Sequence, residues 1–357
     1  MKKYAIRFLA LLLCLTAAIL QSVAEETAEK TGNTALVSFV GDISIGDSKG
    51  SGGYHNCLEK NGLAWPFSLV VDELEKDDLT VGNLEVLFTE RKQHRNKMYP
   101  LKGKPEFVEC LKLGSVEVVN TVNNHCLDYY IDGYKDTLKT LDDAGVGHFG
   151  CMRIGQDPEF DDLYVTDLNG IRFGFFGFSY PQTNDQKKIA ERIARLREQG
   201  CDVVVVSLHW GKETHKDATS GQASYAKKIL DAGADMIFGH HAHVIQQVQF
   251  YNGKLILFNT GNFTFGTMSS VDPATGIFQT EWEKTEEGTQ LKMLRVIPCR
   301  TQLGPEYRPY ILTEEADRTE VFKKLIRKNA PKGLVNLPES FAETGTVYLD
   351  HGEFVTE

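Results

Sequence analysis

Short apolar runs alternate with amphipathic stretches along most of the chain. In the first half, residues 35–40, 79–82 and 116–119 are apolar runs with the length of buried strands. Between them, residues 66–75 and 105–113 have helical periodicity, and each begins with a proline that suits the first turn of a helix. This alternation of strands and helices predicts a layered α/β fold.

Hairpin signals enter in the second half. Two Asn-Gly pairs, at positions 169–170 and 252–253, each separate two strand-like runs, and this dipeptide favours two-residue hairpin turns. The predicted strands are residues 163–167, 171–178, 203–207, 236–238, 244–251, 255–259 and segments of 276–298, and the predicted helices are residues 134–144, 185–199 and 223–232. Helical crossovers combined with hairpins indicate a mixed sheet, or two sheets sandwiched between helices.

The N-terminus has the layout of a secretory signal. Lys2, Lys3 and Arg7 begin it, an apolar run follows over residues 8–20, and small residues before Glu25 offer a cleavage site. Because the run is short for a membrane span, we expect an exported protein of the cell envelope or the medium, with an uncleaved N-terminal anchor as the alternative. The expected organisation is a signal peptide at 1–24, a leader at 25–34, one domain at 35–300 and a C-terminal extension at 301–357 packed on that domain.

Composition narrows the class of protein. The 357 residues are 41% hydrophobic and 25% charged, as in ordinary globular domains. The net charge is −10 and no region is strongly basic, which argues against nucleic acid as a partner. The cysteines after the proposed signal are too irregularly spaced for a disulfide scaffold or a Cys-only zinc site, so we expect small core residues. They are Cys57, Cys110, Cys126, Cys151, Cys201 and Cys299.

Metal-capable side chains recur just after the predicted strands. They are Asp42, Asn83 with Glu85, Asn124 with His125, His209, and His241 with His243. Ligands in α/β sheets collect at the carboxyl ends of strands, so we expect these residues to converge. Imidazole, carboxylate and amide groups together suit Mn, Fe or Zn better than Ca or Mg. The sequence therefore predicts a site for one or two divalent transition-metal ions, in which Asp42 or Glu85 bridges a pair.

Single members of this set also have ordinary explanations. Asp42 is suited to cap a turn, and a lone histidine such as His209 is commonly a hydrogen-bonded core or surface residue. His241 and His243 would face opposite sides of a regular strand, and only a turn directs both inward. The dense histidine cluster and the joint pattern nevertheless favour a metal site.

Neighbouring residues are candidates for catalysis and substrate binding. Asp128 is spaced to orient the ring of His125, which could then protonate a leaving oxygen or stabilise transition-state charge; the alternative is a helix cap. Lys102 and Lys104 precede a predicted helix and are candidate contacts for an anionic substrate, or else a solvated surface pair. Trp210 is a candidate for the rim of the site.

These motifs, in this order, resemble those of the CapA family of poly-γ-glutamate capsule synthesis. The matching segments are Val40-Gly41-Asp42, Gly82-Asn83-Leu84-Glu85, Gly103-Lys104-Pro105, Asn123-Asn124-His125 with Asp128, His209-Trp210-Gly211 with Glu213, residues 239–243 with Val244 and Gln246, and Asn259-Thr260-Gly261-Asn262-Phe263. The likeness covers residues 36–265. The family in turn resembles the calcineurin-like metallophosphoesterases, which implies an α/β four-layer sandwich of two mixed β-sheets flanked by helices.

The same resemblance implies roles for individual residues. Asp42, Asn124, His209, His241 and His243 match metal ligands of the phosphoesterases, and His125 matches their catalytic histidine. Two positions depart from that pattern. Ser44 stands where a histidine is expected, and Asn83 stands where a bridging aspartate is expected, a role that Glu85 could take.

Three functional hypotheses follow. The first is a metal-dependent hydrolase or transferase outside the cytoplasm, acting on a phosphoester or an anionic polymer beside a membrane-bound capsule synthesis complex. The second, which the departures at Ser44 and Asn83 support, is a non-catalytic binding or assembly factor for polymer export. The third is a cell-wall binding protein without a capsule role. Only the first predicts both bound metal and turnover.

Overall fold

The computed structural model describes residues 33–48, 52–150, 163–180, 186–266, 271–326, 331 and 333–355. The expected signal peptide, most of the expected leader and Cys151 lie outside these described residues. Within these ranges, no helix is both long enough and apolar enough to cross a membrane.

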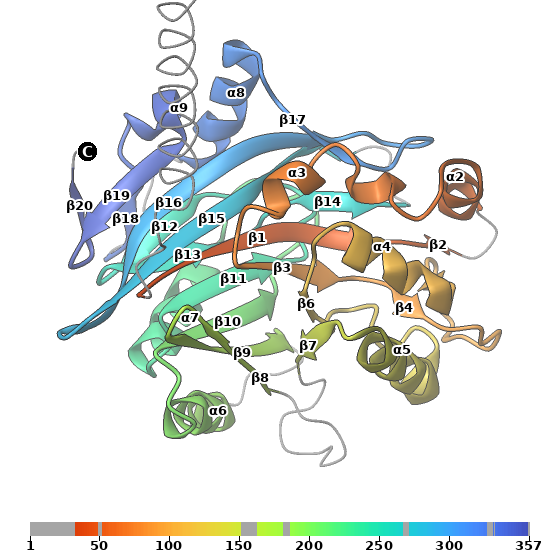
Figure 1. The fold of residues 1–357 in the computed structure, drawn as a ribbon, viewed down its shortest axis with the longest axis horizontal. Helices are drawn as coiled ribbons and strands as arrows, with labels where there is room; N and C mark the ends of the chain where they lie inside the picture. Colours follow the sequence, from red (N-terminus) through yellow and green to blue (C-terminus); the bar gives the residue numbers. More distant parts are fainter. Residues whose placement is uncertain are drawn as a thin grey trace, which may run out of the picture.

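The larger of two main sheets has ten strands of mixed direction (Figure 1). Its strands are β1 Thr34–Ser44, β3 Leu79–Leu84, β6 Val118–Asn120, β7 Gly147–Phe149, β14 Asn262–Phe265, β15 Ala274–Thr285, β16 Gly288–Thr301, β17 Pro309–Ile311, β19 Thr346–Asp350 and β20 Glu353–Val355. The order is β20-β19-β16-β15-β1-β3-β6-β7, with β14 paired to β1 and β17 to β16. Because β1, β3, β6 and β7 are parallel, their carboxyl ends share one edge.

The second sheet has seven strands in the order β18-β12-β13-β11-β10-β9-β8. They are β8 Leu163–Leu168, β9 Ile171–Ser179, β10 Val203–His209, β11 Met236–His240, β12 Val248–Tyr251, β13 Lys254–Leu257 and β18 Val335–Asn336. Both predicted hairpins form. Asn169 and Gly170 have φ of 49° and 83°, and Asn252 and Gly253 have 49° and 74°, the positive values that a type I′ turn requires. A short third sheet joins β2 Asp47–Ser48, β5 Leu101–Gly103 and β4 Leu87–Phe88.

Helices cover the outer face of each main sheet, which gives four layers. Beside the larger sheet lie α2 Gly53–Asn61, the 3-10 turn η1 Trp65–Phe67, α3 Val71–Leu74, the 3-10 turn η2 Pro105–Val108, α4 Glu109–Leu113 and α5 Tyr130–Ala144, and beside the smaller sheet lie α6 Gln186–Glu198 and α7 Ser220–Asp231. Phe39 packs between the sheets with Phe238, whereas the next residue, Val40, packs toward the helices with Phe67. This alternation within β1 buries both faces of the sheet. The predicted four-layer sandwich is confirmed.

Two predicted helices are interrupted. Residues 66–75 form η1 and then the short α3, because no side chain caps α3 and the β-branched Val70 before it has a non-helical φ of −136°. Residues 105–113 likewise begin as the 3-10 turn η2 and continue as α4. By contrast, α5 is a turn longer than the predicted 134–144 and ends at Gly145 in the left-handed conformation.

The segment after residue 300 adds strands to both main sheets. β17 and β19 pair with β16, and β18 pairs with β12. The helices α8 Glu315–Leu325 and α9 Phe341–Thr344 place Phe322 and Phe341 in the core between the sheets. Since β16 ends at Thr301, the boundary proposed at residue 300 falls inside that strand, one residue before its end.

The cysteines within the described residues are small core residues, as predicted. Each is buried with a free thiol; they are Cys57, Cys110, Cys126, Cys201 and Cys299. Burial raises the pKa of Cys110 to about 12, which leaves its thiol protonated and unreactive.

Candidate metal centre

The carboxyl ends of strands from both main sheets meet at one place. The predicted ligands there are Asp42 in β1, Asn83 in β3 and Glu85 just beyond it, Asn124 after β6, His209 at the end of β10, and His241 and His243 after β11. The Nε2 atom of His209 lies 3.1 Å from Oδ1 of Asn124, although β10 and β6 belong to different sheets. The structure therefore brings together side chains that are far apart in sequence.

Asp42 is fully buried and its position is fixed by a close backbone approach. Its N–H donates to the carbonyl of Gly261 at 2.8 Å, and a Cβ on Gly41 would lie 2.0 Å from that carbonyl oxygen, so only glycine fits before Asp42. Asn83 donates from Nδ2 to Oδ1 of Asp42 at 2.8 Å, and its own Oδ1 accepts from Asn120 at 2.9 Å. Asn83 thus orients Asp42, and its oxygen is engaged by Asn120.

Glu85 lies at the centre of the set. Its Oε1 is 3.8 Å from Nε2 of His125, 3.8 Å from Nε2 of His209 and 3.9 Å from Nε2 of His243. Both carboxylate oxygens are buried without a hydrogen-bond partner among the described residues. A carboxylate surrounded by imidazoles from separate strands is well placed to bridge two ions.

The turn after β11 directs His243 toward Glu85 and places His241 beside His209. His241 and His243 have φ of 94° and 57°, in the left-handed region. A non-glycine residue there costs about 1–3 kcal/mol, and such strain is found most often at functional sites. The rings of His209 and His241 lie 4.5 Å apart between centroids, and Nδ1 of His243 is 2.9 Å from Oδ1 of Asn262.

Burial and mutual contact shift the protonation of these groups. Burial alone would raise the pKa of Asp42, but contacts with His240 and His243 outweigh it and hold that pKa well below its usual range. Burial raises the pKa of Glu85 well above its usual range. Burial would lower the pKa of His243, but Glu85 and Asp42 outweigh it and raise that pKa to about 9. A cation bound among these groups would displace protons.

The donor set fits divalent transition-metal ions. Oδ2 of Asp42, both oxygens of Glu85 and Nδ1 of His241 are buried polar atoms without hydrogen-bond partners within the described ranges. Such atoms are costly to bury unless something binds them. Ligand atoms of Asp42, Glu85 and His243 lie within 4.8 Å of one another. Mixed imidazole and carboxylate donors favour Mn, Fe or Zn.

Nε2 of His125 faces the predicted ligands, and the other ring nitrogen, Nδ1, contacts Asp128 and Lys97. Nδ1 lies 2.7 Å from Oδ2 of Asp128, which also accepts from the backbone N–H of Leu101 at 2.8 Å. The ammonium group of Lys97 lies 3.0 Å from the same Nδ1 and donates to Oδ1 of Asp128 at 3.0 Å. Burial lowers the pKa of His125, and the charge of Lys97 lowers it further, against the opposing effect of Asp128. The ring is fixed in orientation and biased toward the neutral form.

Comparison with known families agrees with the motifs and this geometry. The family described as "Bacterial capsule synthesis protein PGA_cap" matches residues 36–267. The chain belongs to the PGA_cap family. This confirms the resemblance that the sequence motifs indicated.

Relatives of this PGA_cap chain include two named proteins. Capsule biosynthesis protein CapA of Bacillus anthracis is 29% identical over 365 residues, which span 93% of this chain and 84% of that protein. PGA biosynthesis protein CapA of Bacillus subtilis strain 168 is 30% identical over 249 residues, spanning 64% of this chain and 62% of that protein. Among solved structures, a novel phosphatase from Mycoplasma pneumoniae is similar with a TM-score of 0.48 and 16% identity over 77% of this chain and 96% of that chain.

The prediction that Trp210 lies at the rim of the PGA_cap site is wrong. Its side chain is fully buried, its indole N–H donates to the carbonyl of Phe258 at 2.9 Å, and the two rings stack. It belongs to the core between the smaller sheet and α6 and α7. Because His209 faces the ligands, the next residue along the extended chain faces the opposite way.

Lys102 and Lys104 are engaged away from the ligands. Lys102 donates to the carbonyl of Arg91 at 2.8 Å. The ammonium group of Lys104 lies 3.5 Å from a carboxylate oxygen of Glu106 and 3.8 Å from one of Glu59. These contacts match the surface-pair alternative better than a substrate-binding role.

Three residues that lie at the site were not among those predicted from the sequence. Lys97 contacts both His125 and Asp128, and its signal was its place in a run, residues 91–105, that contains cations and no acidic residue. His240 is fully buried with Nδ1 3.1 Å from Oδ1 of Asp42. Glu213 approaches His241 and His243, and it already stood in the His209-Trp210-Gly211 motif.

Proposed function

We propose that this PGA_cap protein is a metal-dependent hydrolase of phosphoesterase type that acts outside the cytoplasm on an anionic polymer or phosphoester during capsule polymer synthesis. The observation that carries the proposal is the convergence of buried metal-ligating atoms that lack hydrogen-bond partners among the described residues, beside a histidine held by a carboxylate. The names of the CapA relatives support the polymer pathway, with a membrane-bound synthesis complex as partner.

Two overlapping sets of residues would hold the ions. Asp42, Glu85 and His243 would hold one, while Glu85, Asn124, His209 and His241 would hold the other. Bound divalent ions would supply a Lewis acid for the electrophile and lower the pKa of an attacking water. The chain's contribution is to keep the ligands in place: Asn83 fixes Asp42, and Asn262 fixes His243.

In its protonated form, His125 would deliver a proton from Nε2 to the leaving oxygen, and its lowered pKa would make it a stronger acid in that role. Nε2 faces Glu85, whereas Nδ1 is held by Asp128. Lys97 contacts both members of this pair, so the imidazole cannot turn without breaking several hydrogen bonds. A histidine held in this way typically contributes about 10²–10⁴-fold to the rate.

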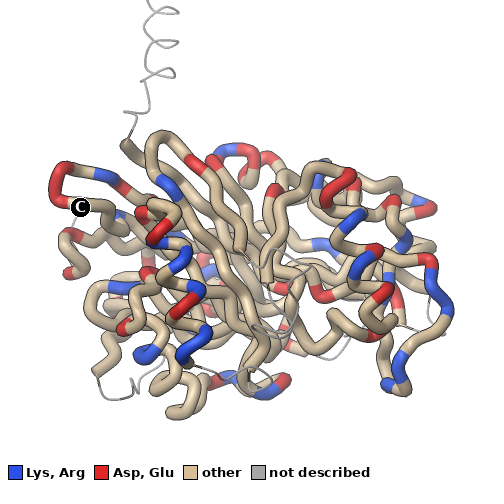
Figure 2. Tube along the Cα trace, turned by 90° about the horizontal axis from the view of Figure 1, so that it is seen from below, with Lys and Arg blue, Asp and Glu red and all other residues tan. Residues whose placement is uncertain are grey.

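The loop between β4 and β5 would attract the negative charge of the substrate. Lys and Arg residues follow one another along it at the right-hand edge of Figure 2. Lys92 and Arg95 are exposed, and Lys97 extends from the same loop to His125. The cations of this loop therefore extend from the surface to the site, although the chain as a whole has a net charge of −10.

The departures from the phosphoesterase pattern at Ser44 and Asn83 favour a second candidate function, that of a non-catalytic factor for polymer assembly. Ser44 is buried with a neutral hydroxyl where a ligand would be expected, and the oxygen of Asn83 is engaged by Asn120. Such a protein would keep the fold and bind an ion or polymer without turning it over.

One experiment separates these functions. The purified protein is analysed for bound Mn, Fe and Zn, and its hydrolysis of bis(p-nitrophenyl) phosphate is compared with that of His125→Ala and of a control, His351→Ala, at an exposed turn. We expect bound metal in all three and at least about 100-fold lower kcat in His125→Ala alone. Bound metal without turnover in the wild type supports the assembly factor, and absence of bound metal contradicts the hydrolase.

A further inference from the structure

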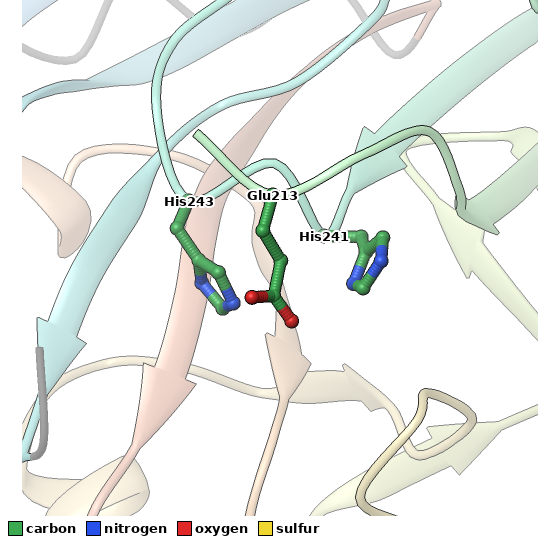
Figure 3. A group of neighbouring side chains, drawn as sticks. All are labelled: Glu213, His241 and His243. Carbon is green, nitrogen blue, oxygen red and sulfur yellow. The ribbon is translucent and has the colours of Figure 1, made fainter. Parts of the chain in front are cut away.

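The loop that follows β10 carries a carboxylate into the candidate metal centre. Glu213 reaches between the rings of His241 and His243 (Figure 3). A carboxylate oxygen of Glu213 and one ring nitrogen of each histidine all lie within 4.8 Å of one another. No part of the phosphoesterase resemblance assigns a role to this residue.

This loop is fastened to the turn that carries the two histidines. The backbone N–H of Thr214 donates to the carbonyl of Ala242 at 2.8 Å. The side chain of Gln246 donates to the carbonyl of His215 at 2.7 Å. Glu213 is consequently held against His241 and His243 from its own side of the site.

The ligands around Glu213 are one donor short of the phosphoesterase pattern. Glu85 can take the place of the bridging aspartate beside Asp42, but Ser44 offers only a hydroxyl where that pattern has a histidine. A carboxylate from Glu213 would bring the number of donors back up and would offset part of the charge of two divalent ions.

The alternative for Glu213 is an exposed carboxylate that merely lies near two imidazoles. Two independent observations favour a ligand. Oδ2 of Asp42 and both oxygens of Glu85 are buried in the same site, and none of them has a hydrogen-bond partner among the described residues. In addition, Nδ1 of His241, beside Glu213, has no hydrogen-bond partner there.

We infer that Glu213 is a metal ligand delivered from the loop after β10, on the ion that His241 holds. This rests on the proposed metal centre. The site would then comprise three carboxylates, and the ion nearest the surface would be bound partly by an exposed loop. Access of substrate to that ion would depend on the position of this loop.

The test compares metal binding by wild type, Glu213→Gln and a matched control, Asp217→Asn, which removes an equal charge from the same exposed loop. Mn²⁺ binding is measured by isothermal titration, and Co²⁺ binding by its visible absorption spectrum. We expect Glu213→Gln to weaken one class of bound ion at least about 10-fold and to change the Co²⁺ band intensities. We expect Asp217→Asn to behave like wild type.

The outcomes separate this inference from the proposed function. If the wild type binds ions and Glu213→Gln binds them with unchanged affinity and spectrum, Glu213 is not a ligand, while the metal centre stands. Equal weakening by both variants would show a long-range charge effect and also overturn the inference. If the wild type binds no ion, the proposed function itself fails.

Discussion

His209 and Asn124 contact each other across the junction of the two main sheets, with Nε2 and Oδ1 3.1 Å apart. His209 ends β10 of the smaller sheet, and Asn124 follows β6 of the larger one. The candidate metal centre therefore depends on the packing of one sheet against the other, and ion binding should in turn stabilise that packing.

Ion binding is accordingly predicted to raise the free energy of unfolding. With free Mn²⁺ at about 100 times its Kd, the gain should be about 2.7 kcal/mol relative to protein in excess EDTA. His209→Ala should lose most of this gain because it removes a ligand, whereas His351→Ala, at an exposed turn, should keep it. Urea unfolding followed by circular dichroism measures both, and an equal gain in both variants would contradict the assigned ligands.

Lys97 is predicted to act through His125. Lys97→Met removes the ammonium group that contacts Nδ1 of His125 and Oδ1 of Asp128, so the imidazole loses orientation. We expect kcat to fall about 10-fold or more while the bound metal stays constant. The matched control is Lys187→Met on α6, where the cation is exposed and outside this loop, and its kcat should be unchanged. An unchanged kcat in Lys97→Met would contradict this role.

Trp210 is predicted to contribute to stability alone. Replacing this fully buried side chain by alanine should lower the free energy of unfolding by about 3–5 kcal/mol. Replacing it by phenylalanine, which keeps a smaller aromatic ring and loses the hydrogen bond to Phe258, should lower it by about 1–2 kcal/mol. KM of Trp210→Phe, measured well below its melting temperature, should equal that of wild type. A KM above that of wild type would indicate that Trp210 contributes to substrate binding.

Asp77 makes stability fall as pH rises. Burial, with the nearby charges of Glu117 and Asp78, raises its pKa from 3.8 to about 7 against hydrogen bonds from Ser38 and Thr80. A raised folded-state pKa favours folding while the carboxyl is protonated, so this contribution is complete below about pH 4 and is lost as pH rises through about 7.

Asp77→Asn should therefore flatten the fall of stability between pH 4 and 7 and be more stable than wild type at pH 8. After discounting for partial exposure, the difference should be about 1–2 kcal/mol. Urea unfolding in the presence of EDTA excludes the pH dependence of metal binding. The control is Asp72→Asn, at an exposed position, whose slope should match that of wild type. Parallel slopes for all three proteins would contradict the shift at Asp77.

The strand ends of the site could be predicted from sequence because polarity changes sharply there. Asp42 and His209 interrupt long apolar runs at points where a parallel sheet collects its ligands. The inward direction of both His241 and His243 followed from the need for a turn, and their positive φ values show that turn. The Asn-Gly hairpins were predictable for a similar local reason.

Contacts between distant loops left no such local signal. Lys97 meets His125 only because the loop between β4 and β5 folds back over the segment after β6, and the polar run around Lys97 looks like an ordinary surface loop in sequence. For Trp210, by contrast, a local signal was present but misleading. Its position after His209 suggested the rim, yet the alternation of an extended chain sends it into the core beside Phe258.

The most direct test of the central claim is a crystal structure of the protein soaked with Mn²⁺, with anomalous diffraction measured at the Mn edge. We predict anomalous density bounded by Asp42, Glu85, Asn124, His209, His241 and His243, with Glu85 between two peaks about 3.5–4 Å apart. Ordered side chains at these positions without anomalous density among them, in crystals that bind Mn²⁺ elsewhere, would contradict the claim.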